Sequence, residues 1–464
     1  MKDFFVLARR NVLRNARRSL LTVLTIVIGL TFIFIIHGFL NGLQREIKEG
    51  VTKAELGEIQ IVRKGFRQAL PTKANDYLFS YNDELKKLVQ STAHVTGVTG
   101  RLLLSGLLNH QASQSTTPML GIGIDPEMEN QVCPRLALLV KAGGGGAFLQ
   151  SNLEKSAKLA GNLAANIEDA PVDANQDYTK PVPQASAVDL PTTQQEFHQL
   201  LIGEYMRRGF TTTTANGERQ AAVGDEIILM VQDVNSSQRS MVTKLSGVLD
   251  VTNPTANKTT AYLVLATAQQ LVGAPGKVTQ LVLSLDNTER RFEVAKALNE
   301  KLAPYGLVAE PWDEINKFFV TIMGLQNAMF SMVTTVIIIF VLVAIIITTL
   351  MSVSERTREI GTLMAIGYKR RHIMSLFMLE STMVGAMGGL IGVTFGSALI
   401  LYLNARGITF QLPGTESPVI LHPFNSVQFS VFTAFLGVIA GGVGAFYPAR
   451  TASKMSPLEA MGHV

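Results

Sequence analysis

Four long runs of apolar residues constrain this chain more than any other feature of its sequence. Residues 19–41, 318–354 and 417–449 contain no Lys, Arg, Asp or Glu, and residues 373–405 contain only Glu380. A helix that crosses the hydrocarbon core of a bilayer needs about 20 mostly apolar residues. Each run is long enough, so the sequence predicts an α-helical membrane protein with four transmembrane helices.

The composition agrees with this interpretation. Only 17% of the 464 residues are charged and 47% are hydrophobic, whereas charged residues make up about 25% of a typical soluble domain. The first run is also longer than the apolar core of a secretory signal peptide, which has about 7 to 15 residues. We therefore expect the first run to remain as a membrane anchor.

Basic residues around the runs indicate the orientation of the chain. Cytoplasmic flanks of membrane spans are enriched in Lys and Arg. The segment before the first run contains one acidic residue, Asp3, and six basic residues: Lys2, Arg9, Arg10, Arg14, Arg17 and Arg18. The N-terminus is therefore expected in the cytosol, and four spans bring the C-terminus to the same side. The net charge of +5 is explained by this topology, so no nucleic-acid partner is expected.

The runs and their flanks divide the chain into segments. We assign a cytosolic N-terminal segment (1–18), a first transmembrane helix (19–41), an outer α+β domain (42–317), a stalk and second transmembrane helix (318–353), a cytosolic loop (354–372), a third transmembrane helix (373–405), an outer loop (406–423), a fourth transmembrane helix (424–448) and a cytosolic tail (449–464).

The outer segment is too long for a loop and is expected to fold as an α+β domain. A helix is predicted over 287–306, where apolar residues recur at helical spacing before Gly306. Residues 141–195 are rich in Gly, Gln, Asn and Pro, and we interpret them as a flexible insertion in which 149–169 could form an amphipathic helix. Alternating apolar residues predict strands over 57–65, 100–108, 118–125, 226–234, 240–251, 260–267 and 278–286.

The sequence contains no recognisable set of catalytic residues. The string GAPGKVT (273–279) departs from a phosphate-binding loop because Val278 replaces the required Ser or Thr. No two histidines lie four residues apart, and neither H-E-x-x-H nor G-x-S-x-G occurs. The single Cys133 excludes an intrachain disulfide. We therefore predict no catalytic residue, metal site or bound cofactor on this chain.

Glu380 and a set of glycines are assigned to helix packing. Glu380 lies about 10 Å along the third run, near its inner end. A hydrogen bond to another helix or a nearby basic partner is favoured there over a proton relay. Glycines at four-residue spacing let membrane helices approach closely. The third run has two such series, Gly385 and Gly389, and Gly388, Gly392 and Gly396, and the fourth run has Gly437 and Gly441.

The second run and the loop after it suggest a mechanical role. A helix of 37 residues is about 55 Å long, against a hydrocarbon core of about 30 Å, so the excess is expected to project as a stalk. In the loop, Arg356, Ile360, Leu363, Met364 and Gly367 share one helical face. The spacing leaves two alternatives, a helix on the membrane surface or a helix that fits a groove in a cytosolic partner.

Several strings resemble one protein family. RTREIGTLMAIGYKRRHI, ESTMVGAMGGLIGVTFG and YPARTASKMSPLEAM resemble the FtsX-like permeases of ABC transporters, a superfamily that includes lipoprotein-release permeases and MacB-type exporters. GFLNGLQREIKEG and GEIQIVRKG resemble the lipoprotein-release branch. GIGIDPEME, LIGEYMRRG, VGDEIIL and VAEPWDEI resemble parts of the MacB-type periplasmic core domain.

The resemblance implies a permease of the bacterial inner membrane that pairs with a second copy or a paralogue. A separate cytosolic ABC ATPase dimer would bind ATP and Mg²⁺ and push on the loop, and the first two helices would transmit this motion to the periplasmic domain. The coupling helix would then contain Arg356, Arg358, Glu359, Ile360, Leu363 and Met364.

From this resemblance we expect release of lipoproteins, or of another lipophilic substrate, from the outer leaflet to a periplasmic acceptor. Phe32, Phe39 and Met323 would face a lipid or substrate groove. Two alternatives stay open. One is an efflux or peptide-resistance exporter linked to an adaptor protein, and the other is a regulator of a periplasmic cell-wall hydrolase that transports nothing.

Overall fold

The computed structural model describes residues 10–12, 14, 16–69, 74–134, 136, 140–142, 198–214, 217–250, 254–410 and 419–455. These residues fall into two compact units. The first unit contains the described residues up to Glu46, Phe318–Phe410 and those from Val419 onward, and the second contains the described residues of Ile47–Lys317. The interpretation of 141–195 as an insertion, with its helix at 149–169, lies outside the described residues apart from 141 and 142.

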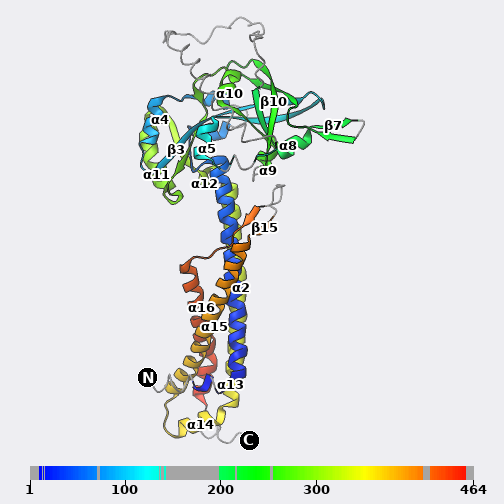
Figure 1. Cartoon of the computed structure of the whole chain (residues 1–464). Helices are drawn as coiled ribbons and strands as arrows, with labels where there is room; N and C mark the ends of the chain where they lie inside the picture. The colour runs from blue at the N-terminus through cyan, green and yellow to red at the C-terminus, as the bar shows by residue number, and fades with distance from the viewer. Residues whose placement is uncertain are drawn as a thin grey trace. The chain divides into compact units, whose positions relative to one another are not determined.

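The first unit is built from four long helices (Figure 1). They are α2 (Ala16–Gly50), α13 (Lys317–Glu355), α15 (Arg370–Arg406) and α16 (Val427–Lys454). All four are long and apolar enough to cross a membrane, so the chain is a multi-pass membrane protein. A short helix, α14 (Thr357–Ala365), joins α13 to α15, and a small hairpin of β15 (Ile408–Phe410) and β16 (Val419–Leu421) lies between α15 and α16.

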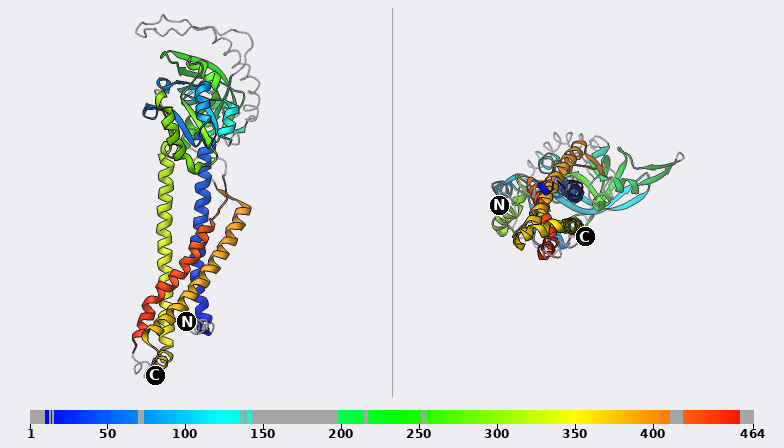
Figure 2. Two further views of the ribbon diagram at one scale, coloured as in Figure 1. Left: turned by 90° about the vertical axis from the view of Figure 1, so that its left-hand side faces the viewer. Right: turned by 90° about the horizontal axis from the view of Figure 1, so that it is seen from below.

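The two glycine series of α15 face different neighbours. A methyl group at Gly389 would lie 2.6 Å from the carbonyl oxygen of Ala434 on α16, whereas one at Gly388 would lie 2.7 Å from Ile26 on α2. Gly385 likewise faces α16, and Gly392 and Gly396 face α2. Because the glycines lack side chains, α15 packs closely against both helices, as the two views in Figure 2 show for the helices of this unit.

The second unit is an α+β domain with a ten-stranded, mixed sheet in the order β14-β1-β13-β3-β4-β11-β6-β10-β5, to which β9 adds by pairing with β10 and β3. The strands are β1 (Ile59–Arg63), β3 (Val95–His110), β4 (Ser115–Ile124), β5 (Val140–Ala142), β6 (His198–Gly203), β9 (Glu226–Gln232), β10 (Gln238–Leu249), β11 (Thr260–Val264), β13 (Gln280–Leu285) and β14 (Leu307–Pro311). Four further strands form small pairs, β2 (Phe79–Ser80) with β12 (Lys277–Val278) and β7 (Thr211–Thr214) with β8 (Gly217–Gln220).

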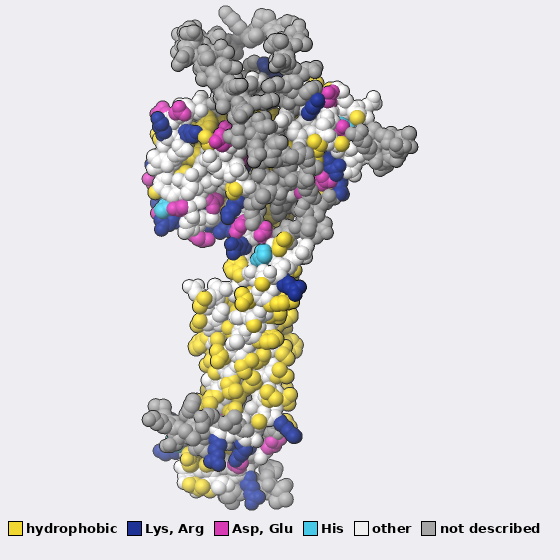
Figure 3. All heavy atoms as spheres, viewed as in Figure 1, with side chains coloured by type: hydrophobic (Ala, Val, Ile, Leu, Met, Phe, Trp, Pro, Cys, Tyr) yellow, Lys and Arg dark blue, Asp and Glu magenta, His cyan; other side chains and the backbone are white. Residues whose placement is uncertain are grey.

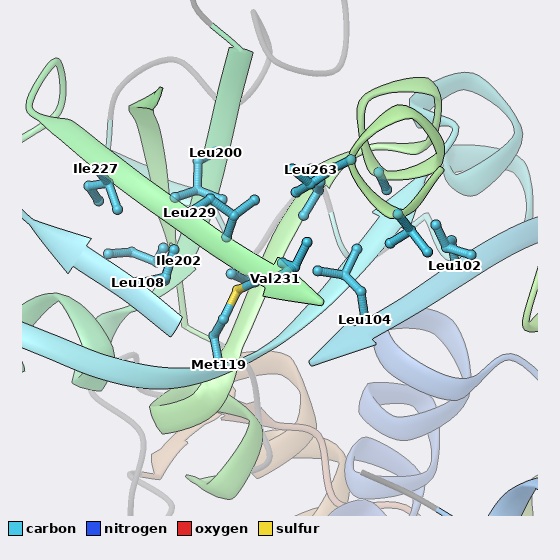
Figure 4. Packing of buried hydrophobic residues seen from close by; sticks show 14 of the residues in the cluster. Leu102, Leu104, Leu108, Met119, Leu200, Ile202, Ile227, Leu229, Val231 and Leu263 are labelled. Carbon is cyan, nitrogen blue, oxygen red and sulfur yellow. The ribbon is translucent and has the colours of Figure 1, made fainter. Parts of the chain in front are cut away.

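The helices of this unit cover the sheet and surround two main clusters of buried apolar side chains. They are α3 (Phe66–Ala69), α4 (Asp83–Gln90), α5 (Pro126–Val132), α8 (Glu204–Gly209), α9 (Pro254–Thr259), α10 (Leu265–Val272), α11 (Arg291–Leu302) and α12 (Trp312–Ile315). One cluster packs around β9 and β11 (Figure 4) and the other packs around β1, β13 and α11. Strand β3 supplies Leu102, Leu104 and Leu108 to the cluster around β9 and β11, and Val98 to the cluster around β1, β13 and α11. It therefore connects the two halves of the domain.

One predicted strand was partly wrong. The strand predicted over 260–267 ends at Val264, where α10 begins. The apolar run continues through this boundary, but Ala268, Leu271 and Val272 have helical spacing and are buried on one face. The boundary at Val264 is not visible in the sequence, because a short apolar run does not distinguish a strand from a helix.

Candidate functional site

The loop between α13 and α15 forms one short helix with a defined end. Helix α14 ends where Gly367 adopts a φ of 105°, a conformation that glycine tolerates best. The N–H groups of Gly367 and Tyr368 donate to the carbonyl oxygens of Met364 and Leu363, at 3.0 and 3.1 Å. These bonds satisfy carbonyl groups at the end of the helix and turn the chain into α15.

One face of α14 packs inward. Ile360 is 2% exposed and joins a buried cluster with Val353 and Phe377. Leu363 and Met364 are partly buried against the same cluster. Three residues predicted to contact a partner, Ile360, Leu363 and Met364, therefore pack against this chain itself.

The opposite face of α14 is exposed. Its stripe consists of Arg358, Thr362, Ala365 and Ile366, which follow the i, i+4, i+7, i+8 spacing of one helical face. Ile366 is 73% exposed, and we refer to these four residues as the exposed face of α14. Arg358 is among the residues predicted to contact a partner, whereas Ile366 is not, although an apolar residue directly before the terminating Gly367 is a signal in the sequence.

Arg356, which precedes α14, points inward and is only 8% exposed. Its Nη1 donates to both carboxylate oxygens of Glu380 at 3.2 and 3.0 Å, and its Nε donates to Glu359 at 3.0 Å. The guanidinium also lies over the ring of Phe377, 5.4 Å from its centre. This arrangement ties the start of α14 to α15 and leaves Arg356 little surface for a partner.

The segment that precedes α2 joins the same group of charges. The side-chain amide of Asn11 donates to Glu380 at 2.5 Å, and Arg14 forms an ion pair with Glu359. We call Asn11, Arg14, Arg356, Glu359 and Glu380 the loop cluster. Asn11 was not predicted as a site residue and Arg14 served only to predict the orientation of the chain, because neither is close to the loop in sequence.

The charges around Arg356 and Glu359 favour the ionised form of both side chains. Burial works against the charged Arg356, but the charges of Glu380 and Glu359 outweigh it and raise the pKa of the guanidinium. Burial alone would raise the pKa of Glu359, but hydrogen bonds from Arg356 and Arg14 lower it overall. Both groups are therefore ionised at neutral pH.

Two small pockets lie within the helical unit. One, of about 60 Å³, borders Asn11 and Glu380 and is lined by hydroxyl groups of Ser19, Thr22, Thr348, Thr349, Ser352 and Ser381. The other, of about 80 Å³, is apolar and lies between α2, α13 and α16. Phe32, Phe39 and Met323 line neither pocket. Phe32 is 52% exposed, Phe39 stacks edge-on against Phe410, and Met323 is partly buried.

No metal site is evident in the described part of the chain, because its His, Cys, Asp and Glu residues do not form a group of three or more that could hold an ion. The loop cluster instead pairs each charged side chain with a group of opposite charge. Such an arrangement can hold segments together and can be opened by mechanical displacement, but it contains no unpaired base or nucleophile.

Two family models match this chain. Residues 331–457 match the model described as FtsX-like permease C-terminal, and residues 19–151 match the MacB-like periplasmic core domain. The first match includes all of α14, α15 and α16 and most of α13. The second begins in α2 and includes β1, β3 and β4.

Curated relatives include proteins named macrolide export ATP-binding/permease protein MacB. One from Campylobacter jejuni is 37% identical over 112 residues, 24% of this chain and 16% of the relative. Another from Hyphomonas neptunium is 30% identical over 205 residues, 43% and 30% of the two chains. One from Neisseria meningitidis is 21% identical over 460 residues, 99% and 60%. This chain thus spans between 16% and 60% of the length of these relatives.

Solved structures give a weaker likeness. The periplasmic region of MacB from Actinobacillus actinomycetemcomitans has a TM-score of 0.31 at 10% identity, and the match covers 56% of this chain and 91% of that one. The extracellular domain of the noncanonical ABC-type transporter YknZ from Gram-positive bacteria has a TM-score of 0.29 at 11% identity, with 54% and 98% covered.

Proposed function

This chain belongs to the superfamily of FtsX-like, MacB-type permeases, and we propose that it is the permease subunit of an ABC transporter in the bacterial inner membrane. The observation that carries the proposal is the exposed face of α14. An apolar side chain, Ile366, stands out between basic residues, as expected of a helix that docks into a groove on a protein partner.

The charge distribution supports a cytosolic position for this face. Lys and Arg side chains gather at the end of the helical unit where α14 lies, whereas the visible face of the long helices is hydrophobic (Figure 3). Lys369, Arg370 and Arg371 follow α14 and are exposed. Basic residues of this kind mark the cytosolic flanks of membrane spans, which favours cytosolic N- and C-termini for a chain with four spans.

We propose that ATP is hydrolysed on a separate cytosolic subunit and that a second permease copy or paralogue completes the assembly. Closure of the ATPase would displace α14. The buried contacts of Glu380 with Arg356 and Asn11 would pass this displacement to α15 and to the segment before α2, whereas the exposed pair of Arg14 and Glu359 would open. The substrate need not cross the bilayer in this mechanism, because the motion itself is delivered to the outer domain.

For the substrate we propose an amphiphilic compound exported with the help of a periplasmic adaptor, because the three relatives are named macrolide export proteins. Release of lipoproteins to a periplasmic acceptor is the second candidate. It is favoured by the resemblance of GFLNGLQREIKEG and GEIQIVRKG to lipoprotein-release permeases. Regulation of a cell-wall hydrolase would be indicated if a soluble hydrolase is captured in place of a substrate.

The test is co-purification of the full chain from its native membrane in mild detergent, followed by mass spectrometry. We compare the wild type with Ile366→Asp and with Ile420→Asp, an equally drastic change at a residue of β16 that is 56% exposed. Leu363 and Met364 are unsuitable because they pack inward, so a change there would also disturb the loop.

We expect an ATP-hydrolysing chain with the wild type and with Ile420→Asp, and its loss with Ile366→Asp. If no such chain appears with the wild type, the assignment to an ABC transporter fails. If Ile366→Asp retains it, the exposed face of α14 is not the contact.

A further inference from the structure

The residues that directly follow α2, in the second unit, have an unusual helical conformation. Residues Val51–Leu56, called η1, continue the helix as a π-helix, and Val51, Thr52, Ala54 and Glu55 are buried there. Short π-helical turns are rare and occur frequently at functional sites. A π-helical turn shifts the register of the side chains, so residues of η1 face partners that an unbroken α-helix would not present to them.

The link from η1 to the sheet contains only two residues, and both are fixed. Gly57 has φ 69° and ψ −172°, a conformation that essentially only glycine adopts. The N–H of Glu58 donates to Leu283 at 2.8 Å, and its carbonyl oxygen accepts from Trp312 at 3.1 Å. The Glu58 carboxylate accepts from the N–H of Leu285 and the hydroxyl of Thr288. The two residues that connect η1 to β1 are therefore held in place by hydrogen bonds and backbone conformation.

Arg101 of β3 connects η1 to the interior of the domain. The residue is 2% exposed, and its Nη1 donates to the carbonyl oxygen of Glu55. Its Nε donates to Glu129 of α5 at 3.2 Å, and its Nη2 donates to Glu129 and to the sulfur of Cys133, the latter at 3.2 Å. The Cys133 thiol in turn lies 3.9 Å from the carbonyl oxygen of Thr52. We call Thr52, Glu55, Arg101, Glu129 and Cys133 the Arg101 cluster.

Stability alone is a poor reason for this cluster. Replacing a buried ion pair by apolar residues of similar volume is often neutral or stabilising, since the attraction of the charges only repays their desolvation. The planar guanidinium, by contrast, offers five donors in a fixed geometry. Arg101 uses them on η1, on α5 and on the residue that follows α5. The arrangement therefore fixes three segments relative to one another.

We propose that Arg101, together with Glu129, is a positioning residue that fixes η1 to β3 and α5, so that a displacement of η1 reaches the sheet instead of being absorbed at the link. The inference rests on the proposed function for the source of the displacement. The fixed joint itself does not depend on an ATPase, so the two can fail separately.

The first test is hydrogen–deuterium exchange of the full chain in nanodiscs, without nucleotide. Arg101→Met with Glu129→Met removes both charges and keeps the volume. The control is Arg291→Met with Asp313→Leu, which removes another ion pair of the same domain, between α11 and α12. We expect exchange over Val51–Leu56 to rise by on the order of tenfold in the first double variant, because local opening sets the exchange rate, and to stay unchanged in the control. Equal exchange in the wild type and the first variant would overturn the joint.

The second test measures the distance between spin labels at the exposed positions Lys53 on η1 and Asn130 on α5. Cys133 does not compete for the label, since it is fully buried and burial raises the pKa of its thiol. With the ATP-hydrolysing partner bound, a non-hydrolysable ATP analogue should leave the distance unchanged in the wild type. The analogue should shift or broaden it in Arg101→Met with Glu129→Met.

Either a nucleotide-dependent distance in the wild type or a fixed distance in the double variant would overturn the positioning role. Failure of the proposed function has a different signature. No ATP-hydrolysing chain would then co-purify, while the exchange result without nucleotide would still report on the joint.

Discussion

The loop cluster and the Arg101 cluster are each centred on a buried arginine that pairs with a carboxylate, Glu380 for Arg356 and Glu129 for Arg101. They differ in the exposure of their other charges. The side chains of Arg101 and Glu129 are 2% and 1% exposed, whereas those of Arg14 and Glu359 are 54% and 47% exposed. Buried charges must keep their partners, but exposed charges can exchange them for water. The Arg101 cluster is therefore suited to a permanent joint, and the outer part of the loop cluster is suited to a contact that opens.

The largest effect is expected from Arg101→Met alone, because it leaves the Glu129 carboxylate buried without a partner. Loss of one member of a buried ion pair costs about 3–5 kcal/mol of stability, and Arg101→Met with Glu129→Met should recover most of it. The only tryptophan of the chain, Trp312, is buried in this domain, so its fluorescence during denaturation reports the unfolding of the domain. A single variant as stable as the wild type would show that Glu129 finds another partner and that the joint is not permanent.

Arg356→Met is expected to have a smaller effect, because the loop cluster retains Asn11 as a donor to Glu380. Hydrogen bonds to charged groups contribute about 1.5–3 kcal/mol, so the midpoint of thermal denaturation, followed by the helical circular-dichroism signal in detergent, should fall. Arg356→Lys should recover part of the loss. Equal stability of Arg356→Met and the wild type would mean that this inner pair does not hold the loop.

Gly57→Ala tests the link that follows η1. The conformation of Gly57 disfavours any other residue by about 1–3 kcal/mol, and a methyl group there would meet Val282 and the carbonyl oxygen of Leu283. We expect Trp312 fluorescence to show a lower denaturation midpoint. Gly276→Ala is the control, since Gly276 also has a positive φ, 66°, but has open space around it. If the two variants are equally destabilised, close packing at the link adds nothing to the backbone effect.

The smallest effect is the pH dependence of the exposed part of the loop cluster. The pKa of Glu359 is lowered in the folded protein from its ordinary value of 4.5. Its contribution to stability is therefore fully present above about pH 4.5 and is lost as the pH falls through the lowered value. Exchange of the α14 amides should be constant from pH 7 to 5 after correction for the intrinsic rate, and should increase below pH 4.5. Arg14→Ala should weaken this increase, and an identical pH profile in that variant would remove Arg14 from the cluster.

The large features of the fold were predictable from the sequence. Apolar runs over 19–41 and 373–405 reveal membrane spans because the bilayer itself imposes their length and composition. Alternating apolar residues revealed strands such as β9 and β13. The short strand β6 was missed, because HQLLIG is too short and too uniformly apolar to show a period of two.

Only part of the candidate site was predictable from the sequence. The charges of residues 354–372 drew attention to the loop, and Glu380 was noticed as an acid within an apolar run. The inward direction of Arg356 was not predictable, since it depends on Glu380, which lies 24 residues away. Arg101 gave no signal, because an arginine beside LLLSGLL is ordinarily a surface residue of a strand. The π-helical turn η1 was not predicted either, and its contacts with Arg101 of β3 and with Cys133 join residues that are far apart in the sequence.

The most direct test of this account is hydrogen–deuterium exchange of the full chain bound to its ATP-hydrolysing partner, with and without a non-hydrolysable ATP analogue. The analogue is expected to change exchange over residues 10–12, 14 and 356–366, where the contact opens. Exchange over Val51–Leu56 and Pro126–Val132 should stay equal, because the joint there is permanent. A change confined to the Arg101 cluster, or no change in the loop, would contradict the account.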